Sequence, residues 1–229
     1  MKAKSTWPAL ESESQELAPN WASGPRLLSS NNLLLLRRGS LFYNGVAETE
    51  RFNAPAALFV PRGVRHELIS GPRGCVIQIL RIRLSAFGLH VEADAEAWEL
   101  VVALSRHVHR HGSRLDLPQR HWGEAMRSLH RIERLGHGQG IGRLAMIKGE
   151  GLQAIAGLAR AVLPKPRAPS PRKVLSFDRI RRVIEHIESH FGKDISVPTL
   201  ARVAGLSRSQ FHAAFREYTG LPQVEYISR

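Results

Sequence analysis

The 229-residue sequence predicts an α+β protein with two domains. Short apolar runs separated by turn residues occupy residues 27–84, a pattern typical of a small β-barrel or sandwich. Amphipathic patterns with helical spacing follow over residues 94–163. After a proline-rich stretch, residues 176–229 show three shorter helical patterns. We therefore expect an N-terminal β domain with a helical appendage, followed by a small all-α domain.

Residues 1–24 mix Lys, Glu, Ser and Pro and lack the apolar core of a signal peptide. We expect a flexible tail there, and the β domain over residues 25–90. The apolar runs that predict its strands are Leu33–Leu36, Leu41–Tyr43, Ala56–Val60 and Cys75–Leu84.

Turn signals separate these runs. Asn44-Gly45 between apolar flanks favours a tight hairpin. Further turns are indicated by Arg38-Gly39, Pro61-Arg-Gly63 and Gly71-Pro72. The last apolar run alternates with a period of two, which predicts a strand with one face of Val76, Gln78, Leu80, Ile82 and Leu84 and another of Ile77, Ile79, Arg81 and Arg83.

The helical appendage is expected over residues 91–163. Apolar side chains recur three or four positions apart in segments 94–111, 119–135 and 141–163. Pro164–Pro171 then holds four prolines, which exclude a helix and favour extended backbone. We expect an interdomain linker over residues 164–175 and a separate domain over residues 176–229.

Charge and cysteine content limit the classes of protein to which this chain can belong. The chain has 33 Lys and Arg against 20 Asp and Glu, so its net charge of +13 favours partners that carry phosphate. Cys75 is the single cysteine, which excludes an intrachain disulfide and suits the cytoplasm. No apolar run reaches the roughly 18 residues of a membrane span.

Residues 176–229 contain start and stop signals for three helices. Ser176 and Ser196 are placed to cap the first and second, and Gly192 ends the first. Gly205 suits a left-handed turn, and Ser207 with Gln210 forms a capping pair at the start of the third. The first helix has an apolar face of Phe177, Ile180, Val183, Ile184, Ile187 and Phe191.

The third helix divides into two faces. Its apolar residues lie three and four apart and are expected to face inward: Phe211, Ala214, Phe215 and Tyr218. The opposite face has the side chains that contact phosphates, base edges and the thymine methyl group in DNA recognition. This candidate DNA-binding set is Arg208, Ser209, His212, Ala213 and Arg216, and an ordinary solvated face is the alternative.

Residues 176–229 resemble the first helix-turn-helix of the AraC/XylS family of bacterial transcription regulators. The matching residues are Ile187-Glu188, Ile195-Ser196, Leu200-Ala201, Ala204-Gly205-Leu206-Ser207, Phe211, Phe215, Thr219-Gly220, Pro222 and Tyr226-Ile227. The resemblance implies double-stranded DNA as a partner, and RNA polymerase as well if the protein is an activator.

The same family has two helix-turn-helix units joined by a long connecting helix. This sequence stops at Arg229, within the segment that matches that helix, so it contains one of the two units. We expect a fragment or a truncated gene product, with weaker DNA binding than two units give.

The β region resembles the cupin-like sensor domain of this family. Pro61-Arg-Gly-Val-Arg-His66 fits the Pro-x-Gly-x-x-His pattern of a cupin strand turn. Metal-binding cupins also need a His-x-His and a Glu upstream, and residues 37–50 contain no His. One imidazole cannot make a three- or four-ligand metal site, so we expect no metal, no cofactor and no enzyme activity.

A cupin-like barrel can bind a small-molecule effector in its interior. The residues expected to line such a pocket are Phe42, Tyr43, Phe59 and His66, with a structural role for His66 as the alternative. Arg81 and Arg83 either attract an anionic ligand or keep an edge strand soluble.

The helices after the barrel often dimerise in this family. Such a homodimer face, or else a face buried within the subunit, is predicted for Trp98, Val101, Val102, Trp122 and Met126. Two further motifs favour ordinary surface roles: the histidines of His107-Val-His-Arg-His111 lack nearby metal-ligand partners, and the Gly-rich segment 136–142 follows a helix and lacks a phosphate-loop ending.

The sequence thus predicts a cytoplasmic, sequence-specific DNA-binding regulator whose N-terminal domain senses an effector or dimerises. Two alternatives remain open: a metal-dependent cupin enzyme with a helical packing module, and a truncated regulator that only binds ligand or dimerises.

Overall fold

The computed structural model describes residues 10–45, 49–83, 87, 92–163, 179–187 and 195–219. The chain divides into two compact units, Met1–Leu163 and Pro164–Arg229. No helix in the described ranges is long and apolar enough to span a bilayer.

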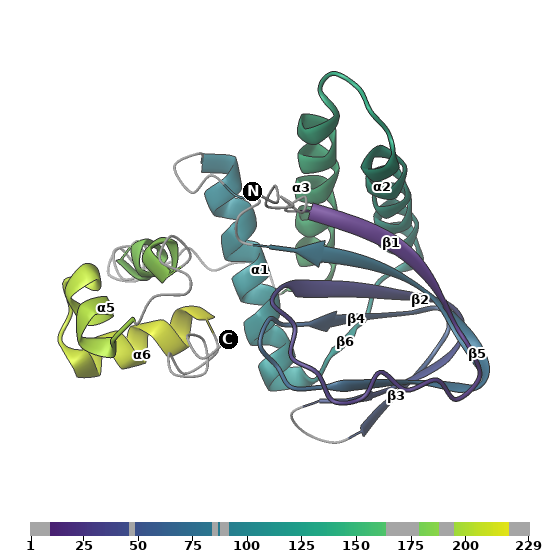
Figure 1. Cartoon of the computed structure of the whole chain (residues 1–229), viewed down its shortest axis with the longest axis horizontal. Helices are drawn as coiled ribbons and strands as arrows, with labels where there is room; N and C mark the ends of the chain where they lie inside the picture. Colours follow the sequence, from purple (N-terminus) through teal and green to yellow (C-terminus); the bar gives the residue numbers. More distant parts are fainter. Residues whose placement is uncertain are drawn as a thin grey trace, which may run out of the picture. The chain divides into compact units, whose positions relative to one another are not determined.

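The first unit is built on one antiparallel sheet that curls strongly (Figure 1). Its strands are β1 (Leu10–Leu17), β2 (Asn31–Asn44), β3 (Thr49–Asn53), β4 (Ala56–Val60), β5 (Glu67–Ile82) and β6 (Arg114–Leu115). Their order is β1-β5-β2-β4-β6, and β3 pairs with the second half of β2. The long strands β2 and β5 are therefore the centre of the sheet, which is antiparallel and extends beyond the predicted range of residues 25–90 through β1 and β6.

Two predicted turns are wrong, because the chain continues as strand through both of them. Arg38-Gly39 lies inside β2, and Gly71-Pro72 lies inside β5. The β2–β5 register shifts around Gly39, which has a φ of +83°. A Cβ on Gly39 would collide with the carbonyl oxygen of Gly74 on the facing strand. The glycines thus permit two facing bulges that bend the sheet, rather than two chain reversals.

The other two turn predictions differ in outcome. Pro61-Arg-Gly63 is a turn, with Gly63 at a φ of +75° and a hydrogen bond of 3.4 Å from Val64 N to Pro61 O. β2 and β3 do form a hairpin, but the register pairs Asn44 with Thr49. The connection is therefore longer than the two-residue turn that Asn44-Gly45 predicts.

The flexible tail expected over residues 1–24 is wrong from residue 10 onward. Leu10–Leu17 forms β1, which pairs with β5 along its whole length, from Leu10 opposite Ile82 to Leu17 opposite Cys75. Ala22 continues the contact through a bridge to Ile69. The segment is polar, so it lacks the usual apolar strand signal, and its backbone hydrogen bonds to β5 hold it in place.

Three helices follow β5, as the periodicity predicts, and the short strand β6 lies between the first two. They are α1 (Glu92–His111), α2 (Gln119–His137) and α3 (Arg143–Val162). α2 packs on β1 and β5, α1 packs on β4, and α3 packs against both other helices. An ion pair between Lys148 Nζ and the buried Asp94 Oδ2, 2.5 Å apart, joins α3 to α1.

The apolar face considered for dimerisation is partly used within the unit. Trp98, Val101 and Val102 on α1 are buried. Trp122 and Met126 on α2 are half-buried. The three residues of α1 are therefore core residues, as the alternative interpretation predicts.

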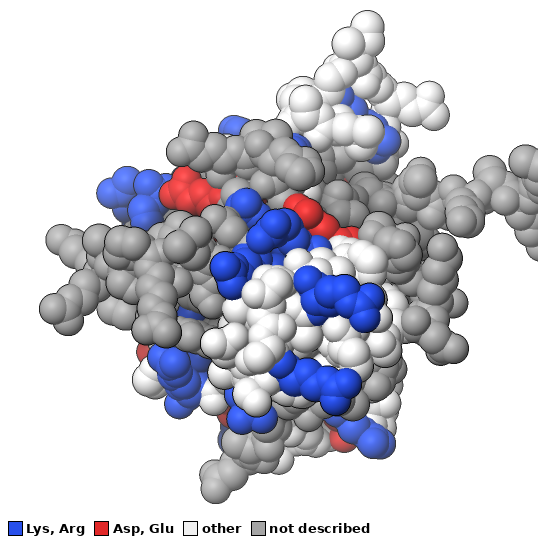
Figure 2. Space-filling model, turned by 90° about the vertical axis from the view of Figure 1, so that its left-hand side faces the viewer, with Lys and Arg blue, Asp and Glu red and all other residues white. Residues whose placement is uncertain are grey.

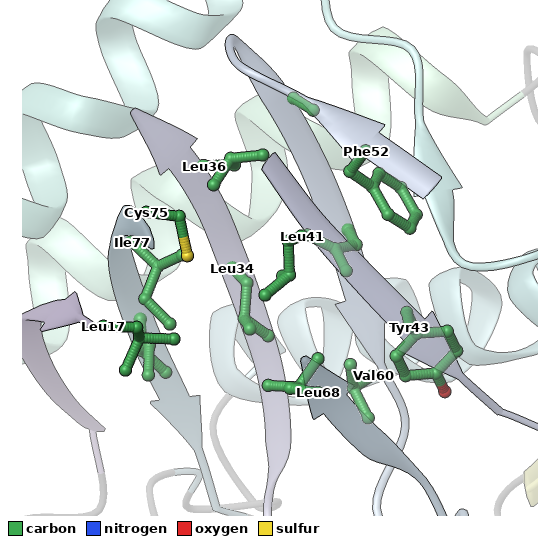
Figure 3. Close-up of a cluster of buried hydrophobic side chains, with 13 residues drawn as sticks. Leu17, Leu34, Leu36, Leu41, Tyr43, Phe52, Val60, Leu68, Cys75 and Ile77 are labelled. Atoms are coloured by element: carbon green, nitrogen blue, oxygen red, sulfur yellow. The ribbon is translucent and has the colours of Figure 1, made fainter. Parts of the chain in front are cut away.

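The core of the first unit lies inside the curled sheet. Alternate residues of β2 and β5 point into it, and Figure 3 shows Leu34, Leu41, Leu68 and Ile77 converging there. The other face of β5 is also covered, because Gln78, Leu80 and Ile82 are buried on the side that α2 contacts. The apolar parts of both predicted faces are thus largely buried, whereas Val76, Arg81 and Arg83 are half-buried and Leu84 lies outside the described residues.

The second unit is helical over residues 179–187 and in α5 (Val197–Ala204) and α6 (Arg208–Thr219). The predicted inward face of the first of these helices is confirmed for Ile180, Val183, Ile184 and Ile187, which are buried. The predictions that fall outside the described residues are the linker, Ser176, Phe177, Phe191 and Gly192. The side chain of Tyr218 is likewise not described.

Candidate nucleic-acid interface and interior cavity

The second unit places two short helices on either side of a three-residue turn, 205–207. Ser196 caps α5, since its Oγ accepts a hydrogen bond of 3.4 Å from Thr199 N. Gly205 ends α5 in the left-handed conformation, at φ 60° and ψ 40°. Leu206 N then donates to Ala201 O at 3.0 Å, which closes the helix end in a Schellman-type motif. The capping and turn predictions are confirmed here.

The start of α6 is fixed by a reciprocal cap. Gln210 N donates to Ser207 Oγ at 3.3 Å, and Ser207 N donates to Gln210 Oε1 at 3.2 Å. This is the capping box that the Ser-x-x-Gln spacing predicts. Arg179, from the preceding helix, donates to Gly205 O at 3.2 Å. The cap of α6 and the Arg179 hydrogen bond therefore both stabilise the turn, and the turn sets the direction in which α6 leaves it.

α6 buries one face and exposes the other. Phe211 and Phe215 are fully buried, with ring centroids 5.4 Å apart. Ala214 is half-buried beside them. The five predicted DNA-binding residues are all exposed and lie together on the opposite face: Arg208, Ser209, His212, Ala213 and Arg216.

The charge around this face is positive. Among the described side chains of the second unit, six arginines accompany one carboxylate, that of Glu185. Figure 2 shows Lys and Arg side chains spread over the displayed surface, with Asp and Glu side chains beside some of them. Such a surface attracts an anion along its whole length rather than at one point.

The four predicted pocket residues of the first unit are not brought into one site. Tyr43 and His66 are both buried and stack, with ring centroids 5.8 Å apart and an interplanar angle of 25°. Phe42 is half-buried and lies under the Arg51 guanidinium, 5.6 Å from ring centroid to Arg51 Cζ. Phe59 is buried on β4 between Leu58 and Val60, whose side chains join the core cluster, so it points to the opposite face of the sheet.

A cavity of about 60 Å³ does lie inside the curled sheet. Of the four predicted pocket residues His66 lines it, and so does Arg81, which the sequence offered as a contact for an anion. Its apolar wall includes Leu17, Leu34, Leu68 and Ile77, which Figure 3 labels. Its polar lining consists of Gln15, Arg26, Asn32, His66 and Arg81. Sequence reasoning missed Arg26, because it lies in an irregular segment with no periodicity to assign it a face.

Most of the charge near this cavity is already paired. Arg81 forms ion pairs with Glu13 and with Glu11, the latter at 3.7 Å, and Arg83 lies 3.9 Å from Glu11. These carboxylates belong to β1, the strand that the sequence did not predict. Arg81 and Arg83 therefore serve first to hold β1 on β5.

The groups with potential catalytic or metal chemistry are dispersed. Burial raises the pKa of the Cys75 thiol to about 11, so it is protonated and unreactive at neutral pH. The His107 and His111 rings lie 4.7 Å apart on α1. Within the described ranges, no three His, Cys, Asp or Glu side chains gather as a metal site would require.

Comparison with known proteins gives a likeness of fold. No protein-family model matches the chain. The structure of CuxR, an AraC-like transcriptional activator, is similar over 97% of this chain and 75% of that one, with 17% identity and a TM-score of 0.51. ToxT from Vibrio cholerae aligns over 96% of this chain and 97% of its own at 9% identity, with a TM-score of 0.42. The cupin domain of Cnp3 from Schizosaccharomyces pombe aligns over 33% of this chain and 57% of its own at 15% identity, with a TM-score of 0.31.

At these identities, the match to CuxR establishes a shared fold and nothing finer. The TM-scores of the other two are too low to add to it. The chain thus has an AraC-like fold, in which an antiparallel sheet with packed helices precedes a small helical unit.

Proposed function

We propose that this chain is a sequence-specific DNA-binding transcription regulator of AraC type. The observation that carries the proposal is the division of α6 into two faces. Phe211 and Phe215 anchor the helix in its unit, while Arg208, His212 and Arg216 stand in solvent with Ser209 and Ala213. A helix presented after a glycine turn, with these side chains outward, suits insertion into the major groove.

The outward residues divide by their chemistry. Arg208 and Arg216 carry the charge that a phosphate or a guanine edge attracts. Ser209 and His212 supply hydrogen-bonding groups for base edges, and Ala213 supplies a methyl group for contact with thymine. The protein would act in the cytoplasm, and as an activator it would also contact RNA polymerase.

The first unit is assigned the sensing role in this proposal. It has a curled sheet with an interior cavity, and helices that pack on the strands around that cavity. We infer that it binds an effector or sets oligomeric state, and that it has no enzyme activity. The half-buried Trp122 and Met126 on α2 are the residues of the predicted dimer face that stay partly accessible.

The test is selection of DNA by the whole chain. The protein is mixed with random-sequence duplexes, the shifted band is sequenced, and the selection is repeated at low and at moderate salt. We expect enrichment of one short motif, and weaker binding as salt rises because counterions compete for the phosphates. Binding with no enriched motif would contradict sequence specificity, and no shifted band at low salt would contradict the proposed function.

A further inference from the structure

The interior cavity of the first unit has a polar end whose hydrogen-bonding groups are mostly occupied. The Arg81 guanidinium is paired with Glu13, and the Gln15 amide also donates to Glu13. Asn32 Oδ1 accepts a hydrogen bond of 2.9 Å from Ser30 Oγ. These groups therefore hold each other in place, and their charges largely cancel.

Arg26 is different, because its buried Nε has no hydrogen-bond partner among the described residues. The guanidinium lies over the Trp21 ring, with Cζ 5.6 Å from the ring centroid. This cation–π contact attracts the guanidinium without using its N–H donors. A buried donor on a cation is costly to leave unpaired, and Arg26 lines the cavity, so an anion bound there would supply the missing acceptor.

His66 stands next to Arg26 by backbone pairing. Arg26 N donates to His66 O at 2.8 Å, and His66 N donates to Arg26 O at 3.0 Å. The ring nitrogen Nδ1 of His66 lies 2.9 Å from Val64 O, and since a carbonyl only accepts, Nδ1 carries the proton. Burial lowers the pKa of His66, and this outweighs the hydrogen bond to Val64 O, which raises it; the Arg26 charge lowers it further. The ring is therefore neutral, and its Nε2 is left as a hydrogen-bond acceptor.

Arg26 supplies a cation whose N–H donors form a planar fork. His66 supplies a neutral hydrogen-bond acceptor beside it. A carboxylate matches the fork of a guanidinium through two parallel hydrogen bonds. A hydroxyl donor matches Nε2 of a neutral imidazole. The cavity volume of 60 Å³ corresponds to roughly four to six water-sized positions. Its apolar wall of leucine and isoleucine suits a short aliphatic chain.

We propose that this cavity binds a small aliphatic hydroxy acid, with the carboxylate on Arg26 and the hydroxyl on His66. The proposal names the effector class for the sensing role proposed above and rests on that role for its regulatory meaning. The binding itself is independent of DNA, and it is measured in the absence of DNA.

The experiment is calorimetric titration of the whole unaltered chain with a matched set of probes. Lactate carries both groups, propionate lacks the hydroxyl, propane-1,2-diol lacks the carboxylate, and inorganic phosphate is a different anion. We expect saturable binding of lactate, affinity for propionate at least fivefold weaker, and no detectable binding of the diol or of phosphate.

The matched variants are Arg26→Gln and Arg73→Gln. Arg73 is an exposed arginine on β5 and serves as the control for lost charge. Arg26→Gln should lower lactate affinity at least tenfold, and Arg73→Gln should leave it unchanged. Equal lactate affinity in Arg26→Gln and the unaltered chain would overturn the proposal. So would phosphate binding as tight as lactate, or the absence of saturable lactate binding. A chain that binds lactate but no DNA would contradict the proposed function alone.

Discussion

Gln78 is fully buried in the middle of β5, where a polar side chain is stable only if it finds partners. Its amide nitrogen donates to Ser12 Oγ and to Glu133 Oε2, each at 3.0 Å. The other oxygen of Glu133 accepts a hydrogen bond of 2.8 Å from Ser14 N. One carboxylate on α2 thus satisfies donors on two strands, and it fixes the helix on the sheet.

Glu133→Leu should therefore lower the free energy of unfolding of the first unit by about 1–3 kcal/mol, because it leaves one N–H of the buried Gln78 amide without an acceptor and removes the hydrogen bond to the exposed Ser14. Urea unfolding followed by tryptophan fluorescence measures this, since all four tryptophans lie in residues 1–163. The control is Glu124→Leu on the same helix. Glu124 pairs with Arg120, whose side chain is 82% exposed, and its loss should change stability much less. Equal effects of the two substitutions would contradict the assigned role of Glu133.

Individual side-chain contacts of this kind cannot be predicted from the sequence. The alternation of β5 correctly places Gln78 with Leu80 and Ile82, but it cannot show that Ser12 and Glu133 meet its amide. Arg26 is a similar case, since its neighbour His66 lies forty positions away and only the backbone pairing joins them.

At the scale of elements, the turn between α5 and α6 depends on one backbone conformation. Gly205 adopts a φ of 60°, and a Cβ there would meet no atom within 4 Å. The strain of a side chain at this position is therefore conformational rather than steric.

Gly205→Ala should destabilise the second unit by about 1–2 kcal/mol, the usual difference for an alanine in the left-handed region. The same substitution at Gly157 is the control, because that residue lies inside α3 and its Cβ position is also open. Gly157→Ala should instead stabilise by about 0.5–1 kcal/mol, since alanine favours helix over glycine. Thermal unfolding followed by circular dichroism measures both, and a stabilising Gly205→Ala would rule out the left-handed turn.

The elements that the sequence predicts well are those with strong local signals. The helices α1 to α3 follow from apolar periodicity, and the caps of α5 and α6 follow from Ser and Gln spacing. β1 was missed because it is polar and its stability comes from β5, far along the chain. The sequence wrongly predicts turns inside β2 and β5, because glycine and proline also occur at bulges within long strands.

At the scale of the whole molecule, the proposal assigns effector binding to the first unit and DNA binding to the second. The first unit contains a cavity with an unsatisfied cation, and the second exposes a basic helix face. The shared fold with CuxR agrees with this division but does not assign either activity to this chain. The central claim is therefore that the exposed face of α6 reads DNA.

The most direct test measures the affinity of three variants for the selected duplex over a range of salt concentrations. Arg216→Ala should weaken binding to every duplex and reduce the slope of log affinity against log salt by about 0.9, the value for one lost phosphate contact. His212→Ala should keep the slope and relax the preference for one base pair. Arg134→Ala, which removes an exposed arginine of α2, should change neither. Unchanged affinity, slope and base preference in Arg216→Ala and His212→Ala would contradict the claim.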